Sequence, residues 1–126
     1  MKLFIGGACQ GKRVYAETVT GITEWIDGNV CEYDEIYSCK AMTHFHMYVR
    51  RCMEEKKDVS ELAEHIIERN PDVVLVANEI GYGVVPVEAF ERNYRETFGR
   101  ICTKLAAYSS EVHRVVCGLG TVIKHD

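Results

Sequence analysis

The spacing of apolar residues changes several times along the chain, and each spacing predicts a different element. Residues 2–5 are a short apolar run that predicts a first strand. Residues 72–78 are a continuous apolar and β-branched run, typical of a strand buried on both faces of a parallel sheet. One or two short strands are expected within residues 30–39, and residues 35–39 are the better candidate. A last strand is expected at 111–117, followed by a short tail.

Spacing of three or four residues predicts the helices. The first extends from Gly11 to about Trp25, where Asp27-Gly-Asn ends it. Thr43 is expected to cap a helix over residues 44–55. Asp58, with Glu61 as its capping-box partner, is expected to begin another that ends before Asn70-Pro71. The longest periodic segment predicts a helix of about six turns. Its apolar positions are Val87, Phe90, Tyr94, Phe98, Ile101, Leu105 and Tyr108.

Composition narrows the class of protein. The 126 residues are 47% hydrophobic and 27% charged, which predicts one globular domain over residues 1–126 and excludes a disordered or membrane-embedded chain. The formal net charge of −4 disfavours a nucleic-acid partner. No secretory signal is evident, and six scattered cysteines without a C-x-x-C pair suit reduced thiols. We therefore expect a cytoplasmic protein.

The segment after the first predicted strand carries a phosphate-loop motif. Residues 6–12 fit G-x-x-x-x-G-K between a strand and a helix, where backbone N–H groups and a lysine surround a phosphate. A glycine turn that binds nothing is the alternative. The predicted nucleotide contacts are Gly6, Gly7, Ala8, Cys9, Gln10, Gly11, Lys12 and Arg13, with Lys12 catalytic. In the motif a Ser or Thr that holds Mg²⁺ comes next, and a guanidinium at that position cannot ligate a metal.

A second unusual loop covers residues 77–86. Asn78 and Glu79 stand at the end of the buried strand, and two glycines follow that permit close backbone approach to a ligand. We predict Asn78 as a nucleotide contact. We predict Glu79 as a catalytic residue that accepts a proton from a hydroxyl or holds water on a metal. The alternative is a tight turn in which Glu79 makes only a structural bond.

Strands that alternate with helices predict a mostly parallel sheet with helices on both faces. Together with the phosphate loop, this gives a P-loop NTPase-like, three-layer α/β/α fold, with four or five strands. Ligands of such sheets bind beyond the carboxyl ends of the strands. The loops that follow residues 5, 78 and 117 are therefore expected at one edge.

With these two loops, the chain resembles the adenosylcobinamide kinase/adenosylcobinamide-phosphate guanylyltransferase family of cobalamin biosynthesis. The family's G-G-x-x-S-G-K-S corresponds to residues 6–13, and its V-x-V-x-N-E-V-G-x-G-I-V-P to residues 74–86. Its R-x-(F/Y)-R-(D/E)-x-x-G-R spacing is similar to residues 92–100. The resemblance implies GTP or ATP as the bound nucleotide, a corrinoid as a further substrate, and a homo-oligomer.

The chain departs from the family pattern where Mg²⁺ would be held. Arg13 replaces the serine of the loop, and the family's D-C-L-T aligns with residues 38–41, where Ser38 replaces the aspartate. A middle section has no counterpart, including the helix whose histidine takes GMP covalently. Phosphoryl transfer depends on the metal to neutralise the phosphate oxygens. The resemblance therefore implies weakened or lost catalysis, and no protein-bound metal is expected.

Two neighbouring histidines, His44 and His46, are candidates for a replacement nucleophile, because a neutral imidazole attacks phosphorus at pH 7. Alternate residues of a helix point about 200° apart, so we do not expect them to act as a pair of metal ligands. His65 and His113 are expected to be ordinary surface or half-buried residues.

Three functions remain open at this point. The first is an active kinase or guanylyltransferase that uses Lys12 and Glu79. The second is a binding or regulatory homologue that keeps a nucleotide site without turnover. The third is a subunit that acts only through assembly. The residues at positions 13 and 38 favour the second on chemical grounds.

Overall fold

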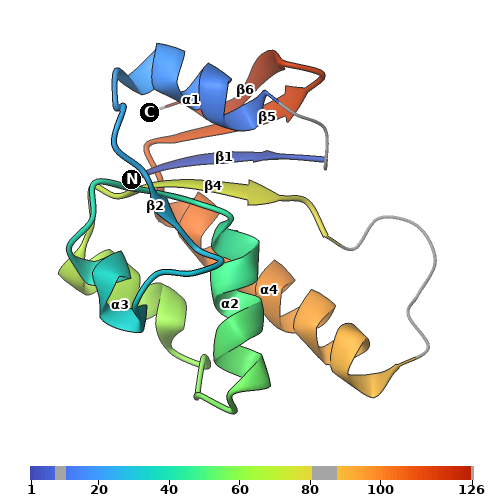
Figure 1. Ribbon diagram of the computed structural model, residues 1–126. Coiled ribbons are helices and arrows are strands. Elements are labelled where there is room, and N and C mark those ends of the chain that lie inside the picture. Colours follow the sequence, from blue (N-terminus) through green and yellow to red (C-terminus); the bar gives the residue numbers. More distant parts are fainter. Residues whose placement is uncertain (8–10, 81–87, 126) are drawn as a thin grey trace.

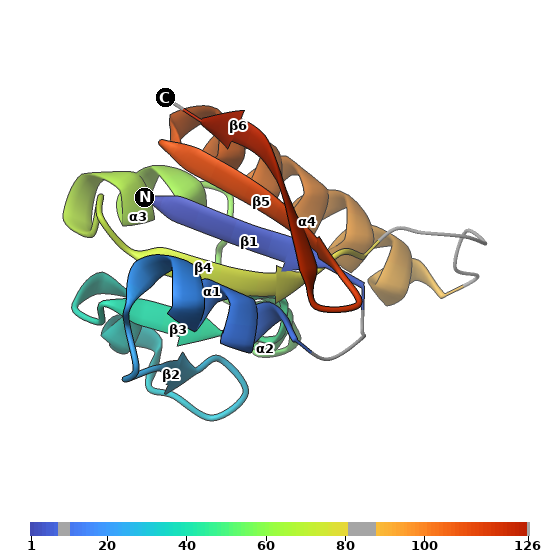
Figure 2. The same cartoon turned by 90° about the horizontal axis from the view of Figure 1, so that it is seen from above.

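The computed structural model describes residues 1–7, 11–80 and 88–125. Its strands are β1 (Lys2–Gly6), β2 (Ile26–Asp27), β3 (Ala41–Thr43), β4 (Val74–Asn78), β5 (Glu111–Val116) and β6 (Leu119–His125). Its helices are α1 (Lys12–Thr20), α2 (Phe45–Glu54), α3 (Leu62–Arg69) and α4 (Ala89–Tyr108), with a 3-10 helix at Tyr33–Tyr37. The strands form one sheet in the order β2-β3-β4-β1-β5-β6, parallel except for the last pair (Figure 2).

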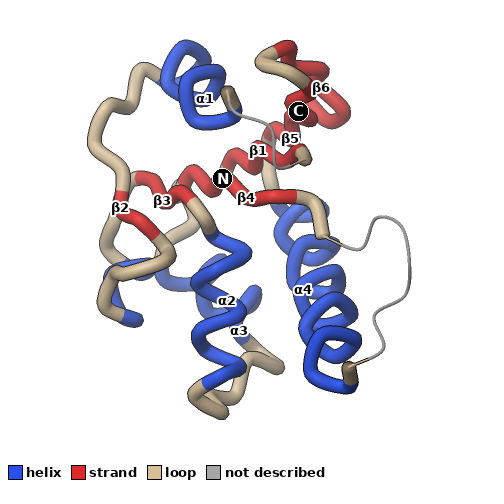
Figure 3. Tube along the Cα trace, turned by 45° about the vertical axis from the view of Figure 1, so that its right-hand side comes forward, coloured by secondary structure: helices blue, strands red, loops and turns tan. Residues whose placement is uncertain are grey.

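The helices lie on both faces of this sheet. Helix α1 covers one face, and α2, α3 and α4 cover the other (Figures 1 and 3). Side chains of β4 alternate between the two, so that Val74 and Val76 join the cluster under α1 while Leu75 joins the larger cluster under the other helices. The predicted P-loop NTPase-like, three-layer α/β/α fold is therefore confirmed.

The parallel register brings the predicted loops together. Gly6 at the end of β1 is opposite Asn78 of β4 on one side and Val115 of β5 on the other. The loops after β1, β4 and β5 consequently leave the sheet at the same edge, as the sequence predicted.

The first helix is shorter than predicted, and the sheet contains an early strand. Helix α1 ends at Thr20 because Gly21 adopts a left-handed conformation (φ 75°) and its N–H donates to the carbonyl of Glu17. Residues 26–27 pair with β3, so Asp27, predicted as the first residue of the helix break at 27–29, ends a short strand. The strand predicted near residues 35–39 is wrong, since a capping box between Glu32 and Glu35 begins a 3-10 helix there.

Two predicted helix starts are also wrong. His44, not Thr43, is the residue before α2, and Thr43 ends β3. Asp58 accepts a hydrogen bond from the N–H of Ser60 (2.9 Å) in a turn, so α3 begins only at Leu62. The predicted ends of these helices agree with the structure to within a residue.

The predicted tail is a sixth strand. Cys117 and Gly118 both have positive φ (50° and 77°), and this pair of left-handed residues turns the chain back so that β6 pairs antiparallel with β5. The sheet therefore has six strands, not four or five. No helix in the described part of the chain is long and apolar enough to span a membrane.

Candidate functional site

The two glycines that frame the phosphate-loop motif lie where a side chain would collide with β5 or its hairpin. A Cβ on Gly6 would lie 2.1 Å from the carbonyl oxygen of Val115. Gly11 has φ 113°, and a Cβ there would lie 2.9 Å from Cα of Gly118. Gly6 and Gly11, on either side of residues 8–10, thus approach β5 and the β5–β6 turn closely with their backbone. Residues 8–10, and with them the predicted contacts Ala8, Cys9 and Gln10, lie outside the described residues.

The lysine of the motif points back across its own loop. Lys12 is only 8% exposed, and its Nζ donates to the carbonyl of Gly7 at 2.5 Å. The ammonium thus lies beside Gly7, at the start of α1. Its position fits the point charge that a phosphate loop supplies to its anion.

Arg13, where the motif has a metal-ligating hydroxyl, lies along the helix. Its Nε is 3.0 Å from Oε1 of Glu17, and its side chain is 56% exposed. The guanidinium thus makes an i,i+4 ion pair on the surface of α1, and it offers no lone pair to a metal.

The residue after β4 is tied to β1 and to β5. The N–H of Glu79 donates to the carbonyl of Gly6 (2.6 Å). The carboxylate of Glu79 forms a two-point ion pair with Arg114 of β5, with Nε–Oε1 at 3.0 Å and Nη2–Oε2 at 3.2 Å. The structural bond that the sequence left as the alternative for Glu79 is therefore present. A catalytic role for this residue stays a prediction.

His46 lies against the end of β4. Its Nδ1 accepts a hydrogen bond from the N–H of Asn78 (3.1 Å), and its carbonyl accepts one from the hydroxyl of Tyr94 (2.7 Å). Burial, aided by the nearby charges of His44 and Lys12, lowers the pKa of His46 from 6.5 to about 4. The ring is consequently neutral at pH 7, with its proton on Nε2.

His44 stands beside it in a strained conformation. It precedes α2 with φ 53° and ψ 41°, and its Nδ1 is 3.1 Å from Oδ1 of Asp27 at the end of β2. Burial tends to raise the pKa of Asp27, but the Asn29 N–H and the His44 charge outweigh it and lower the pKa overall. Because His44 lies outside the helix, its ring centroid comes within 6.0 Å of that of His46, so the 200° separation predicted for a helix is wrong.

The alignment of Ser38 with the family's aspartate is wrong in the structure. Ala41 of β3 is level with Val74, which is level with Lys2 at the amino end of β1. Ser38 precedes Ala41, so it lies toward the edge of the sheet opposite the glycine loop. Thr43 is the residue at the carboxyl end of β3.

The described residues do not fit a metal ion held by the protein. No three His, Cys, Asp or Glu side chains within residues 1–7, 11–80 and 88–125 come together as a ligand set. At the carboxyl edge, the carboxylate of Asp27 is bonded to His44 and that of Glu79 to Arg114.

The start of α1 is fixed to β5 and β6 by a buried polar chain. The ring of Tyr15 lies against Gly120, where a Cβ would be 1.9 Å from it, and its hydroxyl is 2.9 Å from Nδ1 of His113. Nε2 of His113 is 2.8 Å from Oε1 of Glu111, which also pairs with Lys2. His113 is 3% exposed, so the surface or half-buried position predicted for it is wrong.

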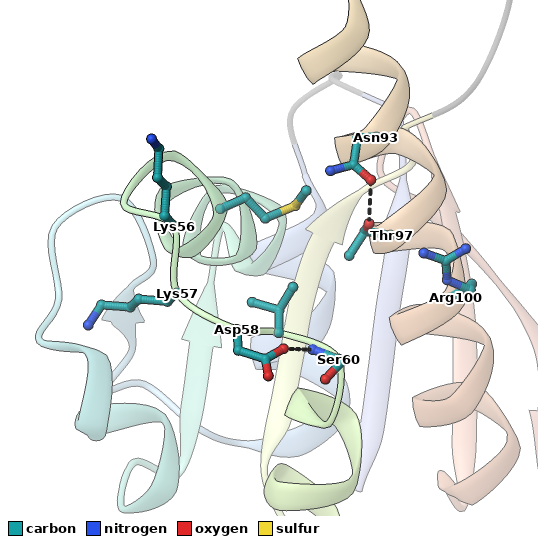
Figure 4. Close-up of a pocket in the computed structure, with 9 residues that line it drawn as sticks. Lys56, Lys57, Asp58, Ser60, Asn93, Thr97 and Arg100 are labelled. Atoms are coloured by element: carbon teal, nitrogen blue, oxygen red, sulfur yellow. Dashed lines mark hydrogen bonds between the residues drawn. The ribbon is translucent and has the colours of Figure 1, made fainter.

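A separate cavity of about 310 Å³ lies away from this edge, between the α2–α3 connection and α4 (Figure 4). It contains none of the predicted site residues. Two of its basic groups are engaged, since Lys57 lies over the ring of Tyr33 and Arg100 pairs with Glu96. Asn93 and Thr97 bond to each other along α4 on one side of it (3.3 Å). We assign it no function.

Comparison with known proteins decides the family. The family model for cobinamide kinase / cobinamide phosphate guanyltransferase (CobU) matches residues 21–123, which is most of the chain. The chain belongs to this family. Two curated relatives, from Escherichia coli K12 and Salmonella typhimurium LT2, are both named bifunctional adenosylcobalamin biosynthesis protein CobU. Each is 48% identical over 52 residues, which cover 41% of this chain and 29% of the relative.

The match to the CobU family covers only part of the site. Asn78, Glu79, His44 and His46 lie within the matched range, while the glycine loop precedes it. The phosphate loop therefore rests on its motif and on its seating against β5. The alignment spans less than a third of the length of the curated CobU relatives.

Sequence reasoning missed three features of this site. The bond between His46 and Asn78, the ion pair between Glu79 and Arg114, and the hairpin at Gly118 each join segments far apart in the chain. A signal existed for the hairpin alone, in the glycines at positions 118 and 120. The other two depend on how distant segments pack together, which a single sequence does not reveal.

Proposed function

We propose that this member of the cobinamide kinase/guanyltransferase family binds the phosphates of GTP or ATP at the carboxyl edge of the sheet, with weakened or lost phosphoryl transfer. The observation that carries the proposal is the buried Lys12 ammonium inside a glycine loop. That loop is held where β1, β4 and β5 end together.

The proposed nucleotide contacts are the loop backbone from Gly6 to Arg13, the side chain of Lys12 and the end of β4 at Asn78. Family membership supports a purine nucleotide, and the names of the curated relatives support a place in adenosylcobalamin biosynthesis. A corrinoid is the corresponding second substrate. Glu79 is the candidate base, and it would have to leave Arg114 to act.

Weak turnover is expected because the described residues at this edge supply no ligands for a metal ion. Arg13 stands at the hydroxyl position, and Thr43 ends β3 without a carboxylate. Without a cation to neutralise the β- and γ-oxygens, the nucleotide binds but transfers its phosphoryl group slowly.

A second function, assembly of a homo-oligomer, is favoured by the free edge of β6. Leu119, Val122 and Ile123 are 76%, 49% and 56% exposed along this outermost strand. An exposed apolar edge strand commonly pairs with another chain. We include a homo-oligomer in the proposal on this ground.

The experiment is equilibrium binding of GTP and ATP to the wild-type chain and to Lys12→Ala, with circular dichroism to verify folding. We expect binding by the wild type and its loss in Lys12→Ala. The matched control is Lys104→Ala, which removes an exposed lysine paired with Glu64 and should bind as the wild type does. Absence of binding at millimolar nucleotide would refute the proposal, and rapid phosphorylation of adenosylcobinamide would refute its claim of weak turnover.

A further inference from the structure

His46 has one hydrogen-bonding atom for which the described residues supply no partner. Its Nδ1 is occupied by the N–H of Asn78. Among the residues that the structure describes, no group accepts a hydrogen bond from its Nε2. The residue is 7% exposed, and its Nε2 is not one of the fully buried, unpaired atoms among the described residues. An N–H donor of this kind can bond to an acceptor on a ligand that reaches this edge of the sheet.

The protonation of the ring is fixed by its surroundings. A backbone N–H can only donate, so Nδ1 of His46 must keep its lone pair, and the proton of the neutral ring must be on Nε2. Protonation of Nδ1 would place two donors face to face, next to the positive charge of Lys12. This tautomer also excludes His46 as a nucleophile, because neither nitrogen has an available lone pair.

The backbone around His46 is held in place as well. Its carbonyl accepts the hydroxyl of Tyr94 from α4, and the residue lies in the first turn of α2. The ring is therefore anchored at Asn78 and the backbone at Tyr94, and the ring cannot turn to exchange its two nitrogens without breaking the bond to β4.

We propose that Nε2–H of His46 donates a hydrogen bond to a phosphate oxygen of the nucleotide held by the Lys12 loop. This inference rests on the proposed function, since the nucleotide supplies the acceptor. The ring bonds to Asn78, which is level with Gly6 at the start of the glycine loop, so an anion held by that loop would lie near the imidazole. A neutral donor adds a directed contact without requiring a proton to be taken up on binding. This donor lies on the side of the candidate site near the end of β3, and β3 supplies no metal-ligating carboxylate there.

The test uses His46→Asn, because the side-chain oxygen of asparagine can still accept the N–H of Asn78 while the Nε2 donor is lost. Pyrophosphate and GTP are titrated in the presence of EDTA into the wild type, His46→Asn and Lys12→Ala. We expect affinity for both ligands to fall roughly tenfold in His46→Asn. His65→Asn, a change at an exposed histidine on α3, is the control and should bind as the wild type does.

Nitrogen-15 NMR of the imidazole gives a second readout that a merely structural role would not move. The wild type should show the Nε2–H tautomer, and the Nε2 resonance should shift when pyrophosphate is added. A ring with its proton on Nδ1 would overturn the inference, with or without ligand. Equal binding by wild type and His46→Asn, with loss in Lys12→Ala, would overturn it while leaving the proposed function intact. No binding by the wild type would overturn both.

Discussion

Arg114 on β5 holds Glu79 after β4 through two parallel contacts of 3.0 and 3.2 Å, across the end of β1. This pair joins the two strands that flank the glycine loop. Because Glu79 is only 19% exposed on its side chain while Arg114 is 41% exposed, the pair is partly shielded from solvent. We expect a coupling energy of about 1 kcal/mol in a double-mutant cycle of Glu79→Gln and Arg114→Gln, measured by urea unfolding.

The control for this cycle is the pair of Arg100 and Glu96 on α4. Its side chains are 61% and 68% exposed, so solvent screens the attraction, and its coupling energy should stay under about 0.5 kcal/mol. Equal coupling energies for the two pairs would contradict the claim that the first one fixes the loop at the carboxyl edge.

Replacement of two glycines, Gly6 and Gly99, by alanine should change the free energy of unfolding in opposite directions. Gly6→Ala places a Cβ 2.1 Å from a backbone oxygen of β5, so the strands must separate, and we expect a loss of at least about 2 kcal/mol in the free energy of unfolding. Gly99→Ala, at an exposed position within α4 where a Cβ has open space, should gain about 0.5–1 kcal/mol. Thermal or urea unfolding of the two variants measures both effects.

The variant Gly7→Ala shows whether the cost of alanine at position 6 comes from packing against β5 or from the conformation of the loop. A Cβ on Gly7 meets nothing among the described atoms within 4 Å, so Gly7→Ala should unfold close to the wild type. If Gly7→Ala were as destabilised as Gly6→Ala, the seating of the loop against β5 would not be the reason for the glycine at position 6.

Stability should fall in acid because of His46. Its pKa is lowered from 6.5 to about 4 in the folded protein, so between these values the unfolded chain binds a proton that the folded chain does not. The contribution of this residue is fully present above pH 6.5 and is lost as the pH decreases to 4. The full loss is on the order of 3 kcal/mol.

Urea unfolding of the wild type and His46→Asn from pH 7 to pH 4 measures this contribution. The variant should lose less stability over the interval than the wild type. His65→Asn should follow the wild-type curve, since that side chain is 51% exposed. Parallel curves for the wild type and His46→Asn would show that the buried ring does not resist protonation.

The fold was predictable from the sequence where one segment determines its own structure. The run of residues 74–78 and the periodicity of α4 identify their elements because a buried strand and an amphipathic helix each need a local pattern. Strand β3 has only three residues and β2 only two, so their pairing depends on neighbours, and no pattern could reveal them. The turn at Cys117 was missed because cysteine is rare at positive φ.

The candidate site was predictable to a smaller extent. The glycine motif located Lys12, and the strand end located Asn78 and Glu79, because motif and strand are both local. The interaction partners lie on distant segments. His46 of α2 bonds to Asn78, and Arg114 of β5 pairs with Glu79. The alignment of Ser38 failed for the same reason, because the register of β3 against β4 decides which residue reaches the edge.

The most direct test of the account is titration of GTP into the wild-type chain with Mg²⁺ and again with EDTA. The buried ammonium of Lys12 and the loop backbone supply the attraction, and the described residues supply no metal ligand set. We predict dissociation constants that agree within a factor of about three in the two buffers. Binding that appears only with Mg²⁺, or no binding in either buffer, would contradict the central claim.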